Sequence, residues 1–274
     1  MQLLLTSSGI NNPTIHKALV DLLGKPIAES NALVVPTGIY PYSVGAAMAY
    51  KAVCGTAPTL LCELGWKSLG LLELTALPSI DRSAWVPAVE ETDALLVWGG
   101  DPLFLSYWMY QSGLPDLLSS LQRPVVYVGV SAGSIVAAPT FGEIYHKPYR
   151  GTGRRLTLED MTFPAGDGEI IMNFITARGA GFTDFALIPH ANHKNWPEAS
   201  FASAPKWAAK LPVPVYAIDD QTAIKVIGDQ WEPASDHAVG NRGPLQPMER
   251  RCLGIFGNTW VRKGSFVNSL ITRA

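Results

Sequence analysis

The chain has few cysteines, no cluster of basic residues and no long apolar run. Cys54, Cys62 and Cys252 are its only cysteines, and no two of them form a C-x-x-C pair. An odd number of widely spaced cysteines argues against both a disulfide framework and a zinc site. The 21 Lys and Arg residues are balanced by 23 Asp and Glu residues and do not gather in one segment. This balance gives no reason to expect nucleic acid as a partner.

The start of the chain lacks the features of a targeting segment. The residues MQLLLTSSG carry no positive charge at their beginning and reach turn residues after a few apolar ones. They predict a first strand rather than a signal peptide, and no apolar run is long enough to span a bilayer. With the scarcity of cysteine, this favours a cytoplasmic protein that binds no membrane. A length of 274 residues, 47% of them hydrophobic, predicts one large domain over residues 1–274.

Short β-branched or apolar runs alternate with helical patterns along the chain. This alternation predicts an α/β fold in which βα units build a mostly parallel central sheet. We expect strands over Gln2–Thr6, Leu33–Pro36, Ser68–Glu73, Ala94–Trp98, Val125–Gly129, Phe185–Ile188, Val215–Ile218 and Ala223–Ile227. We expect helices over Pro13–Leu23, Ser43–Val53, Leu103–Gly113, Ser131–Ala138 and Glu198–Lys210.

Three stretches show no clean period. Phe141–Gly168 is rich in Gly, Pro and charge, and we expect an excursion beside the active site with room for a hairpin. The residues beyond Asp229 are expected to be irregular. The later segment LGIFGNTWVRKG predicts a terminal hairpin around Gly257 and Asn258.

Residues 125–138, VVYVGVSAGSIVAA, contain the most informative motif. A β-branched run leads into a G-x-S-x-G turn, which opens a helix of small residues. In a nucleophile elbow the serine occupies a strained bend between strand and helix, and the flanking glycines let the two elements approach closely. The motif makes Ser131 a candidate nucleophile and the backbone N–H of Ala132 a candidate oxyanion donor. The alternative is a serine that only caps the helix.

A serine nucleophile needs a base, and the chain has five histidines. His16 lies in a helical pattern, and His146 and His237 lie in irregular stretches where a solvated histidine is the usual case. His190 follows the apolar run FALIP, so it is expected at the carboxyl edge of the sheet, where ligands bind in open α/β folds. His193 could form an i,i+3 metal pair with His190, but no carboxylate or cysteine lies close in sequence. We therefore predict His190 as the base and no metal.

The third member of a triad is a carboxylate that orients the histidine. Asp219 and Asp220 follow the strand candidate VPVYAI and fit the same edge of the sheet, although aspartate is also common in exposed turns. The resulting order of serine, histidine and aspartate differs from that of the α/β-hydrolases, which disfavours their fold.

A strand that ends in a glycine pair, DALLVWGGDP, precedes the expected helix at Leu103. Glycines at this point let a backbone N–H approach a substrate carbonyl, so the loop could complete an oxyanion hole with Ala132. A simple turn is the alternative. No G-x-G-x-x-G motif occurs there, so neither a dinucleotide nor another cofactor is expected.

These segments resemble the peptidase E family of serine peptidases, which includes aspartyl dipeptidases and has cyanophycinases as relatives. LLLTSSG, VVPTG, DALLVWGGDPLFL, GVSAGS, GFTDFALIPH and VYAIDDQTAIKV occur in the family's order, over about residues 1–228. The resemblance implies a three-layer fold similar to class I glutamine amidotransferases, with serine in place of their cysteine. It also implies Ser131 as nucleophile, His190 as base and Asp220 as acid, with Gly100 and Ala132 as oxyanion donors.

The chain departs from the family at two positions. Asp220 stands where most relatives have glutamate, so Asp219 remains a rival for the acidic role. Asp101 stands where aspartyl dipeptidases have asparagine after the glycine pair. A carboxylate beside the substrate would repel an N-terminal aspartate, which disfavours Asp-X dipeptides. The alternative is that Asp101 caps the helix near Leu103.

The function predicted from the sequence is hydrolysis of short peptides, as a dipeptidase or exopeptidase, through an acyl-enzyme. Two other functions stay open: an amidase or esterase that uses the same triad on a different small substrate, and a catalytically silent binding protein. The expected partner is a small peptide. The sequence does not determine the oligomeric state, with a homodimer among the options.

Overall fold

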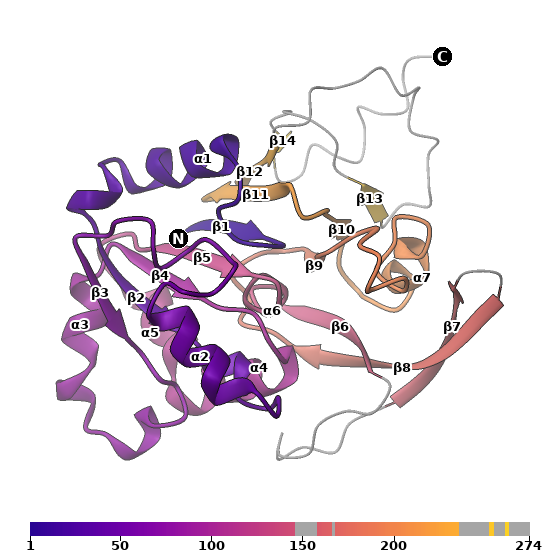
Figure 1. Cartoon of the computed structure of the whole chain (residues 1–274), viewed down its shortest axis with the longest axis horizontal. Helices are drawn as coiled ribbons and strands as arrows, with labels where there is room; N and C mark the ends of the chain where they lie inside the picture. Colours follow the sequence, from indigo (N-terminus) through magenta and orange to yellow (C-terminus); the bar gives the residue numbers. More distant parts are fainter. Residues whose placement is uncertain (146–157, 166–167, 236–251, 255–260, 263–274) are drawn as a thin grey trace.

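An eight-stranded sheet forms the centre of the molecule, with the strand order β14-β12-β11-β1-β5-β4-β2-β3 (Figure 1). The computed structural model describes residues 1–145, 158–165, 168–235, 252–254 and 261–262. The strands of this sheet are β1 (Gln2–Thr6), β2 (Asn31–Val35), β3 (Ser68–Leu71), β4 (Ala94–Val97), β5 (Val126–Val130), β11 (Thr222–Ile227), β12 (Gln230–Ser235) and β14 (Val261–Arg262).

The strands from β1 to β3 in this order run parallel, and β11, β12 and β14 continue the sheet in antiparallel fashion. The predicted α/β fold with a mostly parallel central sheet is therefore confirmed. β4 and β5 are buried along their whole length. Parallel strands covered on both faces have this property, which explains the continuous apolar runs in their sequences.

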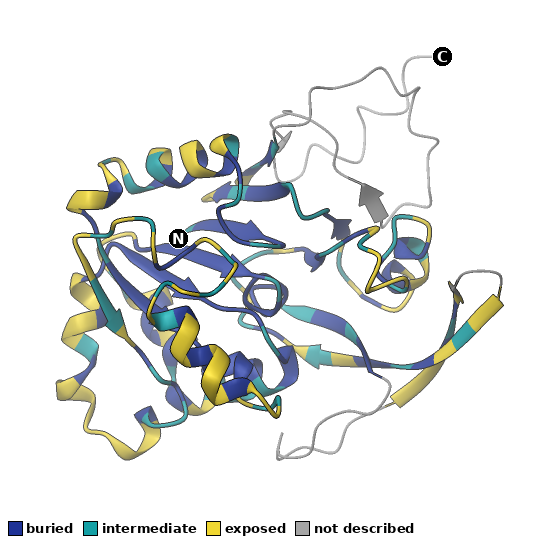
Figure 2. Ribbon diagram, in the orientation of Figure 1, coloured by how far each residue is buried: buried dark blue, intermediate teal, exposed yellow. Residues whose placement is uncertain are grey.

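Helices cover both faces of the central sheet, so the molecule has three layers (Figures 1 and 2). Successive strand residues point to opposite faces: Leu4 and Val128 belong to one core, and Leu5 and Tyr127 belong to the other. The first core packs against α1 (Pro13–Leu23) and α2 (Gly45–Val53). The second packs against α3 (Val86–Glu91), α4 (Pro102–Ser112), α5 (Leu114–Ser120) and α6 (Ala132–Ile135).

Two smaller sheets lie beside the central one. β9 (Ala186–Ile188), β10 (Val215–Ala217) and β13 (Cys252–Gly254) form a parallel sheet, and β6 (Thr140–Tyr145), β8 (Gly168–Arg178) and β7 (Leu158–Ala165) form an antiparallel one. The β7–β8 pair extends away from the central sheet (Figure 1). The remaining helices are α7 (Ala204–Ala208) and the short 3-10 helices Ile27–Glu29, Thr37–Ile39, Leu77–Ser79 and Arg82–Ala84.

Several expectations about these elements are wrong. The strands at residues 186 and 215 belong to their own small sheet rather than to the central one. The residues after Asp229, expected to be irregular, continue as β12. The helix expected over Glu198–Lys210 is only α7, because Pro205 lies in its first turn, where a residue without an N–H fits; further inside a helix its ring would clash with the preceding turn. α3 and α5 were not expected. By contrast, the hairpin for which Phe141–Gly168 left room is present, as the antiparallel pair of β7 with the start of β8.

The predicted hairpin around Gly257 and Asn258 has its turn outside the described residues. The strands on either side of it do not pair with each other: β13 pairs with β10, and β14 pairs with β12. Within the described part of the chain, none of the helices is long and apolar enough to cross a membrane.

Candidate active site

Ser131 lies in a sharp bend between β5 and α6. Its φ of 51° is in a region that residues with a side chain rarely adopt. A Cβ on Gly133 would lie 2.1 Å from the carbonyl oxygen of Val97, and one on Gly129 would lie 2.8 Å from the carbonyl carbon of Gly133. Only glycine fits at either position, so the two glycines of the motif allow the close approach of strand and helix. The expected elbow is present.

Two short parallel strands bring His190 and Asp220 to the same place as Ser131. Ile188 at the end of β9 pairs with Ala217 at the end of β10, so the residues that follow both strands lie together. His190 Nε2 is 2.9 Å from Ser131 Oγ, and His190 Nδ1 is 2.6 Å from Asp220 Oδ1. The imidazole thus connects the hydroxyl to the carboxylate.

Two serines after β1 support this arrangement, and the sequence reasoning assigned them no role. The backbone N–H of His190 donates to Ser7 Oγ over 3.1 Å, while Ser7 Oγ donates to the carbonyl of Ile218. Ser8 Oγ donates to Asp220 Oδ1 over 2.7 Å. The turn sequence TSSG directly after the first strand was the available indication, since small hydroxyl residues at a carboxyl edge often bond to the neighbouring loops.

The neighbouring aspartate makes other contacts. Asp219 Oδ1 accepts hydrogen bonds from the backbone N–H of Gln221 and from Thr222 Oγ1, at 3.0 and 2.7 Å. These contacts hold the turn that leads from β10 into β11. The structure therefore brings Asp220 to His190 and leaves Asp219 to the turn.

The Asp220 carboxyl is in an environment that favours its charged form. Burial on its own raises the pKa of Asp220, but the hydrogen bonds from His190 and Ser8 and the charges of His190 and His193 outweigh it, so the pKa lies below its usual range. An ionised carboxylate can only accept, so Nδ1 of His190 carries the proton of their hydrogen bond. Nε2 then has its lone pair directed at the hydroxyl of Ser131.

The glycine pair after β4 lies beside Ser131. A Cβ on Gly99 would be 3.1 Å from Ser131 Cβ and 3.7 Å from its Oγ. Gly100 has φ +126°, and a Cβ there would be 2.0 Å from the carbonyl oxygen of Gly38, so this backbone requires glycine. Ala132 is the first residue of α6, and its N–H has no carbonyl within the helix to bind. Gly99 thus borders Ser131 with Gly100 next to it in the chain, and Ala132 follows the serine directly.

Asp101 is the N-cap of α4. Its Oδ1 accepts from the backbone N–H of Phe104 over 2.7 Å, and the residue is 2% exposed. These contacts are the ones expected if Asp101 caps α4. A contact between Asp101 and a substrate stays a prediction. Burial raises the pKa of Asp101, partly offset by hydrogen bonds from Phe104, Tyr145 and Leu103.

A second carboxyl lies near Asp101, and the sequence reasoning missed it because its strand was not expected. Desolvation raises the pKa of Glu143 on β6 to about 8, and the charges of Asp101 and Glu198 add to the rise. With a pKa of about 8, Glu143 is mostly protonated at neutral pH.

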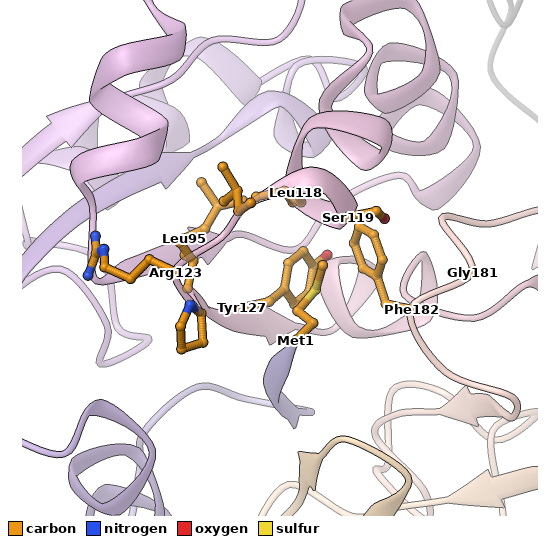
Figure 3. Close-up of a pocket in the computed structure, with 11 residues that line it drawn as sticks. Met1, Leu95, Leu118, Ser119, Arg123, Tyr127, Gly181 and Phe182 are labelled. Atoms are coloured by element: carbon orange, nitrogen blue, oxygen red, sulfur yellow. The ribbon is translucent and has the colours of Figure 1, made fainter.

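Neither a metal site nor the cavity in Figure 3 competes with this site. The described residues contain no group of three His, Cys, Asp or Glu side chains placed to hold a metal ion. The cavity, of about 300 Å³, is lined by residues that include Leu95, Arg123, Tyr127 and Phe182 (Figure 3). Arg123 is just before β5, so this cavity lies at the amino edge of the sheet, opposite Ser131. The carboxyl edge is where ligands bind in such sheets.

Comparison with known proteins agrees with this fold. No curated protein matches the chain. A candidate peptidase E protein from Listeria monocytogenes EGD-e superposes with a TM-score of 0.57 at 17% identity, covering 85% of this chain and 98% of that one. A peptidase from an acI-B1 Actinobacterium superposes with a TM-score of 0.56 at 19% identity, covering 96% and 94%. A model of peptidase family S51 matches residues 3–233. The chain therefore belongs to peptidase family S51 and is a serine-type peptidase.

Proposed function

We propose that the chain hydrolyses short peptides with Ser131 as nucleophile, His190 as general base and Asp220 as the residue that orients the base. The observation that supports this most directly is the pair of contacts through one imidazole, 2.9 Å to Ser131 Oγ and 2.6 Å to Asp220 Oδ1. A hydroxyl is a weak nucleophile by itself, and a base within hydrogen-bond reach activates it.

Acylation of the serine follows from this geometry. As Ser131 Oγ bonds to the peptide carbonyl carbon, its proton moves to His190 Nε2. The oxygen of the tetrahedral intermediate accepts from the backbone N–H groups of Gly100 and Ala132. The intermediate then breaks its carbon–nitrogen bond, and His190 gives the proton to the leaving amine. Loss of one such oxyanion donor typically lowers turnover by ~10²–10³.

Deacylation repeats these steps with water. His190 takes a proton from the water as its oxygen bonds to the acyl carbon, and then returns a proton to Ser131 Oγ as the ester bond breaks. Asp220 stays ionised throughout and stabilises the imidazolium that forms in each half-reaction.

The proposed substrates are peptides cleaved near the N-terminus, in the manner of a dipeptidase or exopeptidase, and the family is the ground for this choice. The proposal includes one catalytic domain over residues 1–274 and action in the cytoplasm. It leaves a homodimer open.

The first test is covalent labelling. A fluorophosphonate should label Ser131 in the parent, and Ser131→Ala should abolish both labelling and turnover with an unchanged Tm. Ser134→Ala is the matched control, because Ser134 lies in the same turn but donates to the carbonyl of Thr6 over 2.8 Å. It should still be labelled. Turnover at the parent rate in Ser131→Ala would exclude the proposed mechanism.

The second test identifies the substrate. A dipeptide library, digested and read by mass spectrometry for the N-terminal residue released, should show cleavage by the parent and none by Ser131→Ala. Panels of simple esters and amides serve as comparison. If Ser131 is labelled but only esters or amides are hydrolysed, the protein is a different acyl hydrolase and not a peptidase.

A further inference from the structure

The loop between β9 and α7 carries His190 at its start and is held together by its own backbone. His190 and Asn192 both have positive φ, 58° and 62°. The N–H of Asn192 donates to the carbonyl of Ala199 over 3.0 Å, which closes the loop. Inside it, His193 N–H donates to the carbonyl of His190, and Trp196 N–H donates to that of His193, each over 3.0 Å. The path of this loop therefore depends on backbone hydrogen bonds.

Trp196 projects from this loop onto the proposed base. Its ring stacks on the imidazole of His190, with centroids 4.6 Å apart and an interplanar angle of 24°. Trp196 is nevertheless 41% exposed, whereas the His190 side chain is 16% exposed. An indole left this open to water contributes little to a hydrophobic core, so its contact with His190 is its most specific interaction.

The second histidine of the loop lies against the same indole. His193 is 4.6 Å from Trp196 and 6.4 Å from His190 between ring centroids. Its Nδ1 accepts the backbone N–H of Asn195 over 3.2 Å, which holds the His193 ring in place. The His193 ring thus restricts the movement of the Trp196 side chain.

A stacked aromatic ring would act on an imidazole in two ways. Rotation of the His190 ring out of its plane would break both the 2.9 Å contact with Ser131 and the 2.6 Å contact with Asp220, and an indole on its face obstructs that rotation. In addition, the electron-rich indole face attracts a cation, so it stabilises the imidazolium form that the proton transfer creates.

We propose that Trp196 is a positioning residue, which keeps the His190 imidazole aligned between Ser131 and Asp220 and stabilises it when it is charged. The inference rests on the proposed function, since it assigns Trp196 a role in activating Ser131. Trp196 acts through His190, and its effect is on the chemical step more than on substrate binding.

The test compares Trp196→Leu with Trp196→Phe. Leucine removes the aromatic face, and phenylalanine keeps most of it. We expect Trp196→Leu to lower kcat and the rate of fluorophosphonate labelling at Ser131 by about 2- to 30-fold, the range of a cation–π contact, with KM within twofold of the parent. Trp196→Phe should recover most of both rates. Lys194→Ala, an exposed change in the same loop, is the control and should match the parent.

A spectroscopic measurement tests the inference without requiring activity. The proton between His190 Nδ1 and Asp220 is in a short, charge-assisted hydrogen bond, so it should give a separate resonance far downfield in the proton spectrum. We expect it in the parent and in Trp196→Phe, and we expect it broadened by exchange with water in Trp196→Leu. If a fluorophosphonate does not label Ser131 in the parent, the proposed function is refuted, even when this resonance behaves as expected.

Three outcomes would overturn the inference. The first is an unchanged labelling rate and an unchanged resonance in Trp196→Leu. The second is a higher KM with kcat retained, which would make Trp196 a substrate contact instead. The third is equal loss in the leucine and phenylalanine variants, in step with a fall in Tm, which would indicate a purely structural role. If leucine alone prevents folding, Trp196→Met provides the same comparison with a flexible apolar side chain.

Discussion

Two adjacent aspartates follow β10 and make different contacts. Asp220 meets the imidazole of His190, while Asp219 accepts two hydrogen bonds inside the turn. Both residues lie beyond the end of β10, in the turn that leads to β11, and only the carboxylate of Asp220 reaches the imidazole. One matched pair of substitutions therefore tests which of the two aspartates is the acidic member of the triad.

Asp220→Asn should lower kcat by up to ~10⁴, because an amide no longer selects the tautomer with the proton on Nδ1. Asp219→Asn should leave kcat within a few-fold of the parent and lower Tm slightly, since it weakens the turn. Steady-state kinetics and thermal melts of both variants give the comparison. A larger kinetic loss in Asp219→Asn would transfer the acidic role to that residue.

Asp101 gives a prediction about specificity. An ionised Asp101 carboxylate beside the glycine pair makes the local potential negative and favours a positively charged group on the substrate. We expect the parent to have higher kcat/KM for Leu-Leu and Lys-Leu than for Asp-Leu. Asp101→Asn should reduce the difference in kcat/KM between these peptides and Asp-Leu. The substitution keeps the helix cap, because asparagine caps a helix as well as aspartate does. A strong parent preference for Asp-Leu would refute the repulsion argument.

At the scale of elements, the elbow is a close crossing of β4 and α6. Gly133→Ala would place a methyl group 2.1 Å from the backbone oxygen of Val97, so β4 or α6 must move. We expect a loss of several kcal/mol in stability, in the upper range for single substitutions, and loss of Ser131 labelling. Gly168→Ala is the control, because a Cβ there meets nothing within 4 Å. Denaturant melts of both variants measure the difference, and equal stability would show that the crossing tolerates a side chain.

Helices and strands whose ends are marked by nearby residues in the sequence were predicted well. β1 and α1 have the predicted bounds, Gln2–Thr6 and Pro13–Leu23. The helix begins with the Asn12 side chain accepting from Ile15 N–H and ends at Gly24 with φ 66°, so capping chemistry present in the sequence determines both ends. Ser131 and His190 were proposed for a similar reason, since each follows a recognisable apolar strand, whereas Asp220 was chosen over Asp219 because of the family resemblance.

Elements that depend on distant partners were missed. β8 (Gly168–Arg178) alternates only partly between buried and exposed residues and has β6 and β7 as its neighbours. The β7–β8 pair is the hairpin for which the segment 141–168 left room. The pairing with β6 joins residues distant in the sequence and has no local indication. Glu143 on β6 escaped notice for the same reason, and Trp196 did so because a ring contact across a loop has no sequence period.

At the scale of the whole molecule, stability should depend on pH through Glu143. A carboxyl whose pKa rises from 4.5 to about 8 on folding binds its proton more tightly in the folded chain. Its contribution is therefore fully favourable at low pH and is lost as pH increases from about 4.5 to about 8. Glutamine is neutral at every pH, so the Tm of Glu143→Gln should exceed that of the parent by an amount that grows between pH 5 and pH 9.

Calorimetry at pH 5, 7 and 9 would measure this difference. Glu169→Gln, at an exposed position on β8, is the control and should follow the parent at each pH. A constant difference between Glu143→Gln and the parent across this range would show that Glu143 has the same protonation in the folded and unfolded chain.

The position of β1 has a consequence for how the chain is made. Leu5 pairs with Gly129 on one side and with Ile224 on the other, so β1 is translated long before its second neighbour, β11. Until residue 227 emerges, a nascent chain has an apolar strand with one open edge, the kind of edge that recruits other chains. A pause in translation before β11 therefore prolongs the time for which this open edge can pair with another chain.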